Sequence, residues 1–216
     1  MTLALLRLLQ LSDSAFPAGT YAFSDGLETL TQRGQVTSAA ELTAFLRGQL
    51  QCGWGRQDLP ACALAWNASA AELAELDALL TDLKPVAGPR GASVRTGTNL
   101  RRAALHLWPG HLSALAPVIH HATSFGAIAA ALGVSRPDAV TAYVSAWLLG
   151  RSVSATRLMK LGGLEAQRVA AHLEGEALAC VARALGAGPD DLGGFSPALD
   201  IAASEQEKLP LRLFQT

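Results

Sequence analysis

The feature that most constrains the fold is a series of helix-start signals, each of which is followed by an alanine- and leucine-rich segment. Two of these segments open with a serine that is followed three residues later by a glutamate, at Ser38 with Glu41 and at Ser69 with Glu72. In this capping box each side chain satisfies a backbone N–H at the start of a helix. Few runs alternate apolar and polar residues with a period of two, as strands would. The sequence therefore predicts an all-α, single-domain helical bundle of roughly eight to ten helices.

Two further helices are indicated by apolar stripes with clear boundaries. One begins after Ser135, which is a suitable cap, and has Pro137 in its first turn, where proline is tolerated. The other follows an apolar stripe over residues 169–185, and Gly186 is expected to stop that helix.

A glycine marks an expected contact between helices. Gly97 lies inside an apolar stripe that runs from Val94 to Leu107. Because glycine costs a helix about 1 kcal/mol relative to alanine, a close helix crossing would explain its presence. The preceding stretch, residues 84–93, is rich in proline and glycine and is expected to be a loop.

The composition favours a protein that has a sizeable core and that covers part of its surface with partners. Half of the residues are hydrophobic, and charged residues make up 16% of the chain, against a usual share of about 25%. The net charge of −1 gives no indication of nucleic-acid binding. Only the stretch from Leu83 to Pro137, which contains no Asp or Glu but several basic residues, keeps that hypothesis open. Such a stretch indicates either an acidic partner or a solvated face, and we favour the solvated face.

The compartment is expected to be reducing and cytoplasmic. The chain has three cysteines, an odd number without CxxC spacing, which disfavours a disulfide framework or a zinc knuckle. The N-terminus lacks the features of a signal peptide. Residues 103–135 carry no Lys, Arg, Asp or Glu, but Pro109, Gly110 and Pro117 interrupt them, so we expect buried helices and no membrane span.

Motifs for catalysis or for cofactor and metal binding are absent from the sequence. There is no phosphate-binding loop, dinucleotide fingerprint, zinc-protease motif or nucleophile elbow. His120 and His121 are neighbours and would point about 100° apart on a helix, so core or surface histidines are favoured over a metal site. Ser12, Asp13 and Ser14 are more typical of a turn or cap than of a nucleophile. We therefore predict no catalytic residue, no metal site and no cofactor.

The segment "LLQLSDSAFPAGTYAFSDGLE", residues 8–28, resembles the N-terminal signature of the urease accessory protein UreF family. The matching positions are Gln10, Ser12, Asp13, Pro17, Gly19, Ser24, Gly26, Leu27 and Glu28. We expect this segment to form a folded entry into the first helix, with its turn shaped by Pro17 and Gly19.

Four further segments resemble later elements of the same family, so the resemblance covers essentially the whole chain. They are "PRGASVRTGTNL" at 89–100, "HHATSFGAIAAALGVS" at 120–135, "RLMKLGGLEAQRVAAHLE" at 157–174 and "FSPALDIAASEQEKLPLRLF" at 195–214. The chain departs from the family pattern at Lys160, where proline is frequent, and at Gly163, where glutamine is frequent. It also has Glu205-Gln206-Glu207 where a basic or histidine-containing run is common.

The resemblance implies an all-helical, dimer-forming adaptor that is not an enzyme. Its family acts in nickel delivery to urease, in a complex with the accessory protein UreD (called UreH in some systems) and with the GTPase UreG. The assembly engages the urease apoprotein. The expected partners of this chain are therefore a UreD/UreH-type protein, a UreG-type GTPase, the urease apoprotein and a second copy of itself, with neither nucleic acid nor membrane.

Two segments are the candidate partner sites. Residues 189–216 form a tail whose end alternates Leu209, Leu211 and Leu213 before Phe214. Such a tail either docks back on the domain or becomes ordered on a partner. We expect it to help bind the UreD-type partner through a small set of apolar residues, namely Ile201, Leu209, Leu213 and Phe214.

The turn from Arg157 to Gly163, with Lys160 and Gly162, is expected near the dimer or GTPase-facing surface. An alternative function is regulation of GTP hydrolysis by the UreG-type partner, with an exposed arginine acting on the phosphate charge. The candidate arginines are Arg90, Arg95 and Arg157.

Overall fold

The computed structural model describes residues 2–209 and 213–214, so Leu211 lies outside the described residues. Helices account for all the regular secondary structure of the described residues, which confirms the predicted all-α fold. Within the described residues, ten α-helices have nine residues or more, and two are shorter. The first six are α1 (Thr2–Ser12), α2 (Leu27–Gln32), α3 (Ala39–Cys52), α4 (Trp54–Ala65), α5 (Ala70–Leu83) and α6 (Ala87–Leu107). The next six are α7 (Pro109–Leu112), α8 (His121–Ala131), α9 (Arg136–Leu158), α10 (Gly163–His172), α11 (Glu174–Gly186) and α12 (Pro197–Glu205).

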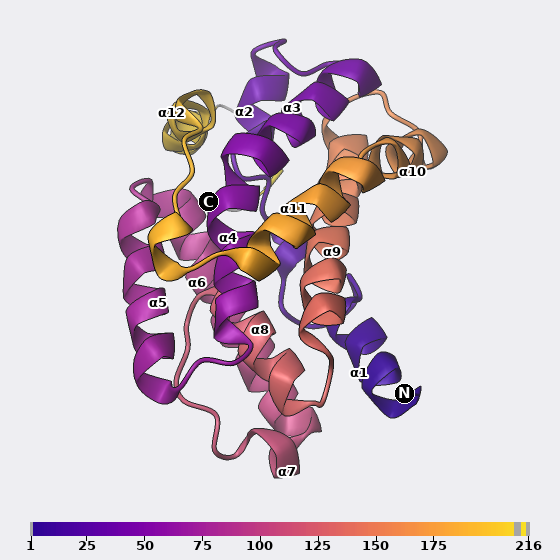
Figure 1. Cartoon of the computed structure of the whole chain (residues 1–216). Coiled ribbons are helices and arrows are strands. Elements are labelled where there is room, and N and C mark those ends of the chain that lie inside the picture. The colour runs from indigo at the N-terminus through magenta and orange to yellow at the C-terminus, as the bar shows by residue number, and fades with distance from the viewer. Residues whose placement is uncertain (1, 210–212, 215–216) are drawn as a thin grey trace.

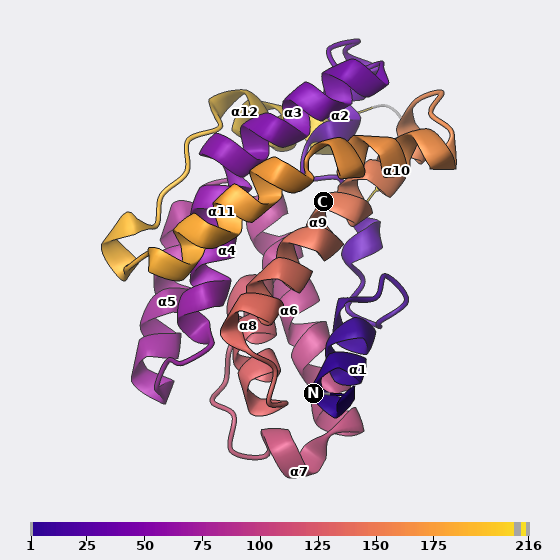
Figure 2. The same cartoon turned by 45° about the vertical axis from the view of Figure 1, so that its right-hand side comes forward.

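Helix α8 lies at the centre of the bundle, between α4 and α6 (Figures 1 and 2). Its residues 122–129 are all buried. Two glycines make this close packing feasible. A Cβ on Gly97 of α6 would lie 2.2 Å from the carbonyl oxygen of Ile119, and one on Gly126 would lie 2.2 Å from that of Cys62. The close crossing predicted at Gly97 is confirmed.

The predicted helix starts are also confirmed. Ser38 with Glu41 and Ser69 with Glu72 both form complete capping boxes. The Ser135 side chain accepts a hydrogen bond from the backbone N–H of Asp138 at the start of α9.

The loop predicted at residues 84–93 is wrong over most of its length. Helix α6 begins at Ala87, so Pro89 and Gly91 are both helical. Proline is tolerated here because the first backbone N–H groups of a helix have no partner within it. The composition of the segment was therefore compatible with a helix start.

The apolar stripe over residues 169–185 belongs to two helices and not to one. Helix α10 ends at His172 and α11 begins at Glu174, with the fully buried Leu173 at the junction. The bend lets both helices keep their apolar side on the core. Hydrophobic spacing alone does not reveal such a junction, because the stripe continues across it.

A buried carboxylate fixes the start of α8. Asp77 of α5 accepts hydrogen bonds from the backbone N–H groups of Ile119 at 2.7 Å and His120 at 3.2 Å, and from the Thr123 hydroxyl at 2.6 Å. A negative charge at this position complements the positive end of the helix dipole. Asp77 therefore caps α8 from a neighbouring helix.

His120 is a core residue that joins two helices. Its ring nitrogens lie 3.0 Å from the Thr81 hydroxyl and 3.0 Å from the Ser93 hydroxyl. Burial lowers the pKa of this imidazole below its usual value. Across the described parts of the chain, no cluster of three or more His, Cys, Asp or Glu side chains is placed to hold a metal ion.

Hydropathy along the helices gives no membrane-spanning segment. Within the described residues, none of the helices combines the length and the apolar character that crossing a bilayer requires.

Candidate partner-docking site

The segment between α1 and α2 is a folded turn. The Asp13 carboxylate accepts the backbone N–H of Ala15 at 2.7 Å, and Ser12 donates its hydroxyl to the carbonyl of Leu8 at 2.8 Å. Asp13 therefore caps a turn, as predicted, whereas Ser12 is the last residue of α1 and bonds back to the preceding turn of that helix. The expectation that the segment enters the first helix is wrong, because α1 precedes it and α2 follows it. Gly19 and Gly26 both have positive φ, at 80° and 89°, which L-residues rarely adopt.

The end of this segment binds the C-terminal tail. Glu28 is fully buried, and its carboxylate accepts the backbone N–H groups of Leu213 at 2.6 Å and Phe214 at 3.3 Å. The side-chain amide of Gln206 donates to Glu28 at 3.2 Å and to the hydroxyl of Ser24 at 3.1 Å. We call these five residues the clasp. It joins the two ends of the chain through hydrogen bonds to a buried charge, which are among the stronger hydrogen bonds in proteins.

An arginine covers the tip of the tail. Phe214 is only 5% exposed, and the guanidinium of Arg157 on α9 lies 4.7 Å from the centre of its ring. Arg157 itself is exposed. A cation over an aromatic face is attractive, by about 0.5–1 kcal/mol at an exposed site.

Helix α12 is part of the same arrangement. It packs on α2 at the point where Gly26 has no side chain (Figure 1). A Cβ on Gly26 would lie 2.9 Å from the Leu199 side chain and 3.2 Å from the backbone nitrogen of Ala203. An ion pair between Arg33 and Glu205 adds a contact at the surface.

The C-terminal segment thus has an inner and an outer side. Phe214 faces inward, whereas three apolar side chains remain exposed: Phe195 is 78% exposed, Ile201 on α12 is 55% exposed and Leu213 is 48% exposed. Leu209 is half-buried. Of the two arrangements expected for the tail, this structure has the one in which the tail docks back on the domain.

The structure brings together only some of the predicted site residues. Arg157, Leu213 and Phe214 meet at the clasp. Lys160 and Gly162 are exposed in the turn between α9 and α10, away from α12, which carries Ile201 (Figure 1).

Sequence reasoning assigned no role to the residues that hold the tail. Ser24 and Glu28 were matched only as signature positions, and Gln206 only as part of a departure from the family pattern. The available signal was an acidic residue that lies between two leucines at the start of a helix, in "GLETL". A carboxylate in such a place is buried only where hydrogen-bond donors meet it.

The other candidate arginines contact groups of their own chain. Arg90 donates to the carbonyl of Lys84 at 2.9 Å and to that of Pro85 at 3.3 Å. Arg95 lies 5.0 Å from the centre of the Phe23 ring.

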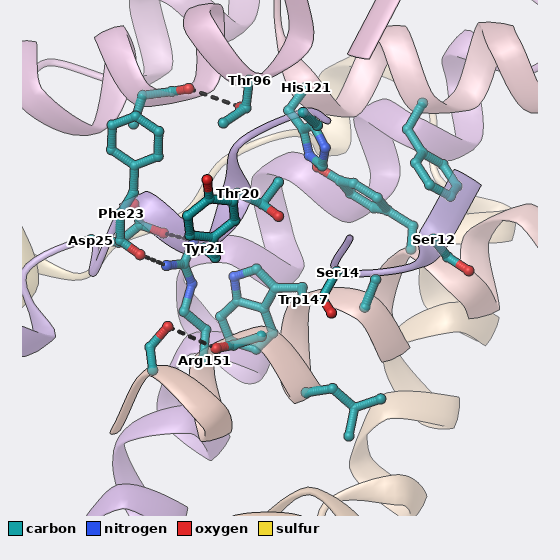
Figure 3. A pocket seen from close by; sticks show the side chains of 18 of the residues that line it. Ser12, Ser14, Thr20, Tyr21, Phe23, Asp25, Thr96, His121, Trp147 and Arg151 are labelled. Carbon is teal, nitrogen blue, oxygen red and sulfur yellow. Dashed lines mark hydrogen bonds and ion pairs between the residues drawn. The ribbon is translucent and has the colours of Figure 1, made fainter. Parts of the chain in front are cut away.

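A pocket of about 480 Å³ lies under the N-terminal segment, with α4, α6, α8 and α9 forming its other walls (Figure 3). Lys84 and Asp58 form a buried ion pair of 2.6 Å in its wall. His121 Nδ1 lies 3.2 Å from the Tyr143 hydroxyl. Burial lowers the pKa of His121 to about 4 and raises that of Tyr143 well above its usual value, so both side chains are neutral near pH 7.

The chain is similar over nearly its whole length to known proteins. The family model described as UreF matches residues 36–174. A urease accessory protein UreF from Arthrobacter sp. (strain FB24) is 31% identical, with 98% of this chain and 96% of the relative covered. The UreF of Mesorhizobium japonicum is 32% identical, with 100% and 97% covered, and that of Trichodesmium erythraeum is 29% identical, with 97% and 95% covered. The chain therefore belongs to the UreF family of urease accessory proteins.

Proposed function

We propose that this chain is an adaptor, with no catalytic activity of its own, that assists nickel insertion into urease. It bridges a UreD/UreH-type protein and a UreG-type GTPase, and the assembly engages the urease apoprotein. Membership of the UreF family supports a role in urease maturation. The observation that best supports bridging is the two-sided C-terminal segment, which is anchored inside the fold and apolar on its outer side.

The outer side of this segment is the proposed docking site for the UreD/UreH-type protein. Phe195, Ile201 and Leu213 are all exposed within 19 residues of chain. Exposed apolar surface is typical of interaction sites, and aromatic residues often carry much of the binding energy. In this proposal Phe214 and Leu209 support the segment from within.

The turn after α9 is the proposed contact for the GTPase. Arg157 and Lys160 are exposed, and the described residues provide no ion-pair partner for either. Gly162 lies beside them and is also exposed. Two cations without counterions favour an acidic patch on a partner, which would speed association.

Helix α1 is the proposed contact for a second copy of the chain. Leu3, Leu5, Leu6 and Leu9 are each between 51% and 63% exposed, so much of this helix offers leucine to solvent. The helix lies at the edge of the bundle (Figure 2). We expect Leu6→Glu to convert a dimer into a monomer in analytical ultracentrifugation. A wild-type monomer would contradict the dimer, and a dimer that persists in the variant would place its interface elsewhere.

Co-purification with the UreD/UreH-type protein tests the docking site. Phe195→Ser with Ile201→Ser should abolish co-purification while leaving the helical circular dichroism unchanged, because neither side chain is in the core. Leu178→Ser on α11, where the leucine is 60% exposed, is the matched control and should co-purify normally. Unchanged co-purification of the double variant would refute this site. Deletion after Gly194 is less specific, since it also leaves the buried Glu28 without its partners.

A second candidate function is control of GTP hydrolysis by the GTPase, and the position of Arg157 favours it. The only contact described for its guanidinium is with the Phe214 ring, so its N–H groups remain available for phosphate. In the complete complex, Arg157→Ala should then lower the rate of GTP hydrolysis at least about tenfold. Arg90→Ala is the control, since Arg90 binds backbone carbonyls of its own chain. An unchanged rate of GTP hydrolysis in Arg157→Ala would exclude this second function and leave the adaptor role as the only one proposed.

A further inference from the structure

The pocket under the N-terminal segment is lined by an unusual share of the aromatic residues of the chain. Both tyrosines, two of the four tryptophans and three of the six phenylalanines line it. Its volume of about 480 Å³ is within the range of small-molecule sites, roughly 300–1,000 Å³. The docking of protein partners does not require such a chamber, so the pocket calls for a separate explanation.

Stacked rings form one wall of the pocket. Trp54 of α4 and Trp147 of α9 stack with ring centres 4.5 Å apart and planes 13° apart. The ring of Tyr143 lies 5.2 Å from that of Trp54, and Phe125 lies 5.0 Å from Tyr143. Figure 3 shows Trp147 among the side chains of the pocket. Such a wall favours another flat ring, which would stack or meet it edge to face.

Polar groups with unused hydrogen-bonding capacity accompany the rings. Trp54 and Trp147 are half-buried, and no acceptor for either indole N–H is found among the described residues. By contrast, Trp66, which is outside the pocket, donates its indole N–H to the carbonyl of Val134 at 2.9 Å. His121 uses Nδ1 in its contact with Tyr143, which leaves Nε2 for another partner. A carbonyl or hydroxyl group on a ligand could use these groups.

Four of the six charged side chains of the pocket are paired with one another. Asp58 pairs with Lys84, and Asp25 pairs with Arg151 at 2.5 Å. The other two, Asp13 and Arg157, are exposed to solvent. A charged ligand that enters among the buried rings would therefore lose its hydration without gaining a counterion from the paired residues, which is costly in a buried site.

From these features we infer that the pocket binds an uncharged, planar aromatic molecule that carries a carbonyl or hydroxyl group. The rings of Trp54, Trp147 and Tyr143 hold its faces or edges, and the indole N–H groups and the His121–Tyr143 pair bind its oxygen. This activity goes beyond the adaptor role, and neither requires the other.

Fluorescence titration of the purified full-length chain tests this inference. The probe is prodan, an uncharged naphthalene ketone whose emission shifts to the blue in an apolar site. We expect saturable binding to one site per chain with quenching of tryptophan emission. Naphthoate and naphthylmethylammonium, which are charged rings of similar size, should displace prodan at least about tenfold less well than uncharged acetylnaphthalene. Equal displacement by all three would overturn the assignment of an uncharged ligand.

Variants that fill the pocket test its location. A side chain added at Gly150, which lines the pocket, meets no other atom within 4 Å of its Cβ position. Gly150→Phe should weaken prodan binding about tenfold or more. Gly175→Phe on α11, where a Cβ also meets nothing within 4 Å, is the matched control and should bind normally.

A second pocket-filling variant controls for the possibility that Gly150→Phe misfolds. Ala146→Leu, one turn away from Gly150 on α9, should weaken binding in the same direction. Both filling variants should retain the helical circular dichroism and the co-purification behaviour of the wild type. Undiminished binding in a folded filling variant, or no saturable binding by the wild type, would overturn the inference.

Discussion

The carboxylate of Glu28 accepts a hydrogen bond of 2.6 Å from the backbone N–H of Leu213, which joins the start of the chain to its end. The bond lies in a buried site that also receives Phe214 and Gln206. Because the contact uses the backbone of the tail, it holds the tail in place while leaving the Leu213 side chain free to face outward. Glu28, a residue of the N-terminal signature, is thus a structural anchor for the proposed docking segment.

Glu28→Gln should loosen the tail. The amide keeps the shape of the carboxylate but loses its charge and presents N–H groups to donors, so we expect a loss of roughly 2 kcal/mol in tail docking. Trypsin cleavage after the exposed Lys208 should become at least about tenfold faster, as measured by mass spectrometry. Glu176→Gln, which removes a surface ion pair with Arg47, is the control and should leave the cleavage rate unchanged. Equal cleavage of all three proteins would show that Glu28 does not hold the tail.

Two glycines of α6 should respond to alanine in opposite directions. At Gly97 the new methyl group would lie 2.2 Å from the carbonyl of Ile119, so Gly97→Ala should lower the free energy of unfolding by about 2 kcal/mol. At Gly91 nothing lies within 4 Å, so Gly91→Ala should raise it by up to about 1 kcal/mol, through helix propensity. Urea denaturation measures both changes. A stable Gly97→Ala protein would contradict the close crossing of α6 and α8.

Removal of the Asp77 carboxylate should destabilise the centre of the bundle. Asp77→Ala leaves two backbone N–H groups and the Thr123 hydroxyl without this acceptor, so we expect a loss of about 3 kcal/mol in the free energy of unfolding. Asp82→Ala, at an exposed position on the same helix, should change it by less than about 0.5 kcal/mol. Similar effects of the two substitutions in urea denaturation would exclude a capping role for Asp77.

Mild acid should weaken the fold through His121. Burial lowers the pKa of this imidazole from 6.5 to about 4, so below pH 6.5 the unfolded chain binds a proton that the folded chain does not. The stabilisation is complete above pH 6.5 and is lost as the pH falls toward 4. Between pH 6.5 and about pH 5 the wild type should lose about 2 kcal/mol more than His121→Gln, as measured by urea denaturation at each pH. Parallel losses in the two proteins would contradict a neutral His121 in the folded state.

The sequence predicted the helical fold well because its local signals agree with the tertiary structure. The capping boxes at Ser38 and Ser69 need only residues within one turn, and the glycine at Gly97 reports directly on how near another backbone lies. The break at Leu173 was not predictable in this way. It interrupts backbone geometry but not the spacing of apolar residues.

The clasp could not be predicted from local sequence signals, for a different reason. Its hydrogen bonds connect Ser24 and Glu28 with residues almost the whole chain away, such as Gln206 and Phe214. Periodicity and turn chemistry describe neighbours in sequence, and they carry no information on which distant donors meet a carboxylate. The pocket was unpredictable on the same ground, since its aromatic rings come from several helices and the N-terminal segment.

The mass of the assembly tests most directly whether this protein acts by joining other proteins. The UreD/UreH-type and UreG-type proteins should be mixed with and without this chain and measured by light scattering after size-exclusion chromatography. We expect one complex that contains all three proteins and that does not form when this chain is omitted. Association of the other two to the same extent without it, or elution of this chain on its own, would contradict the adaptor role.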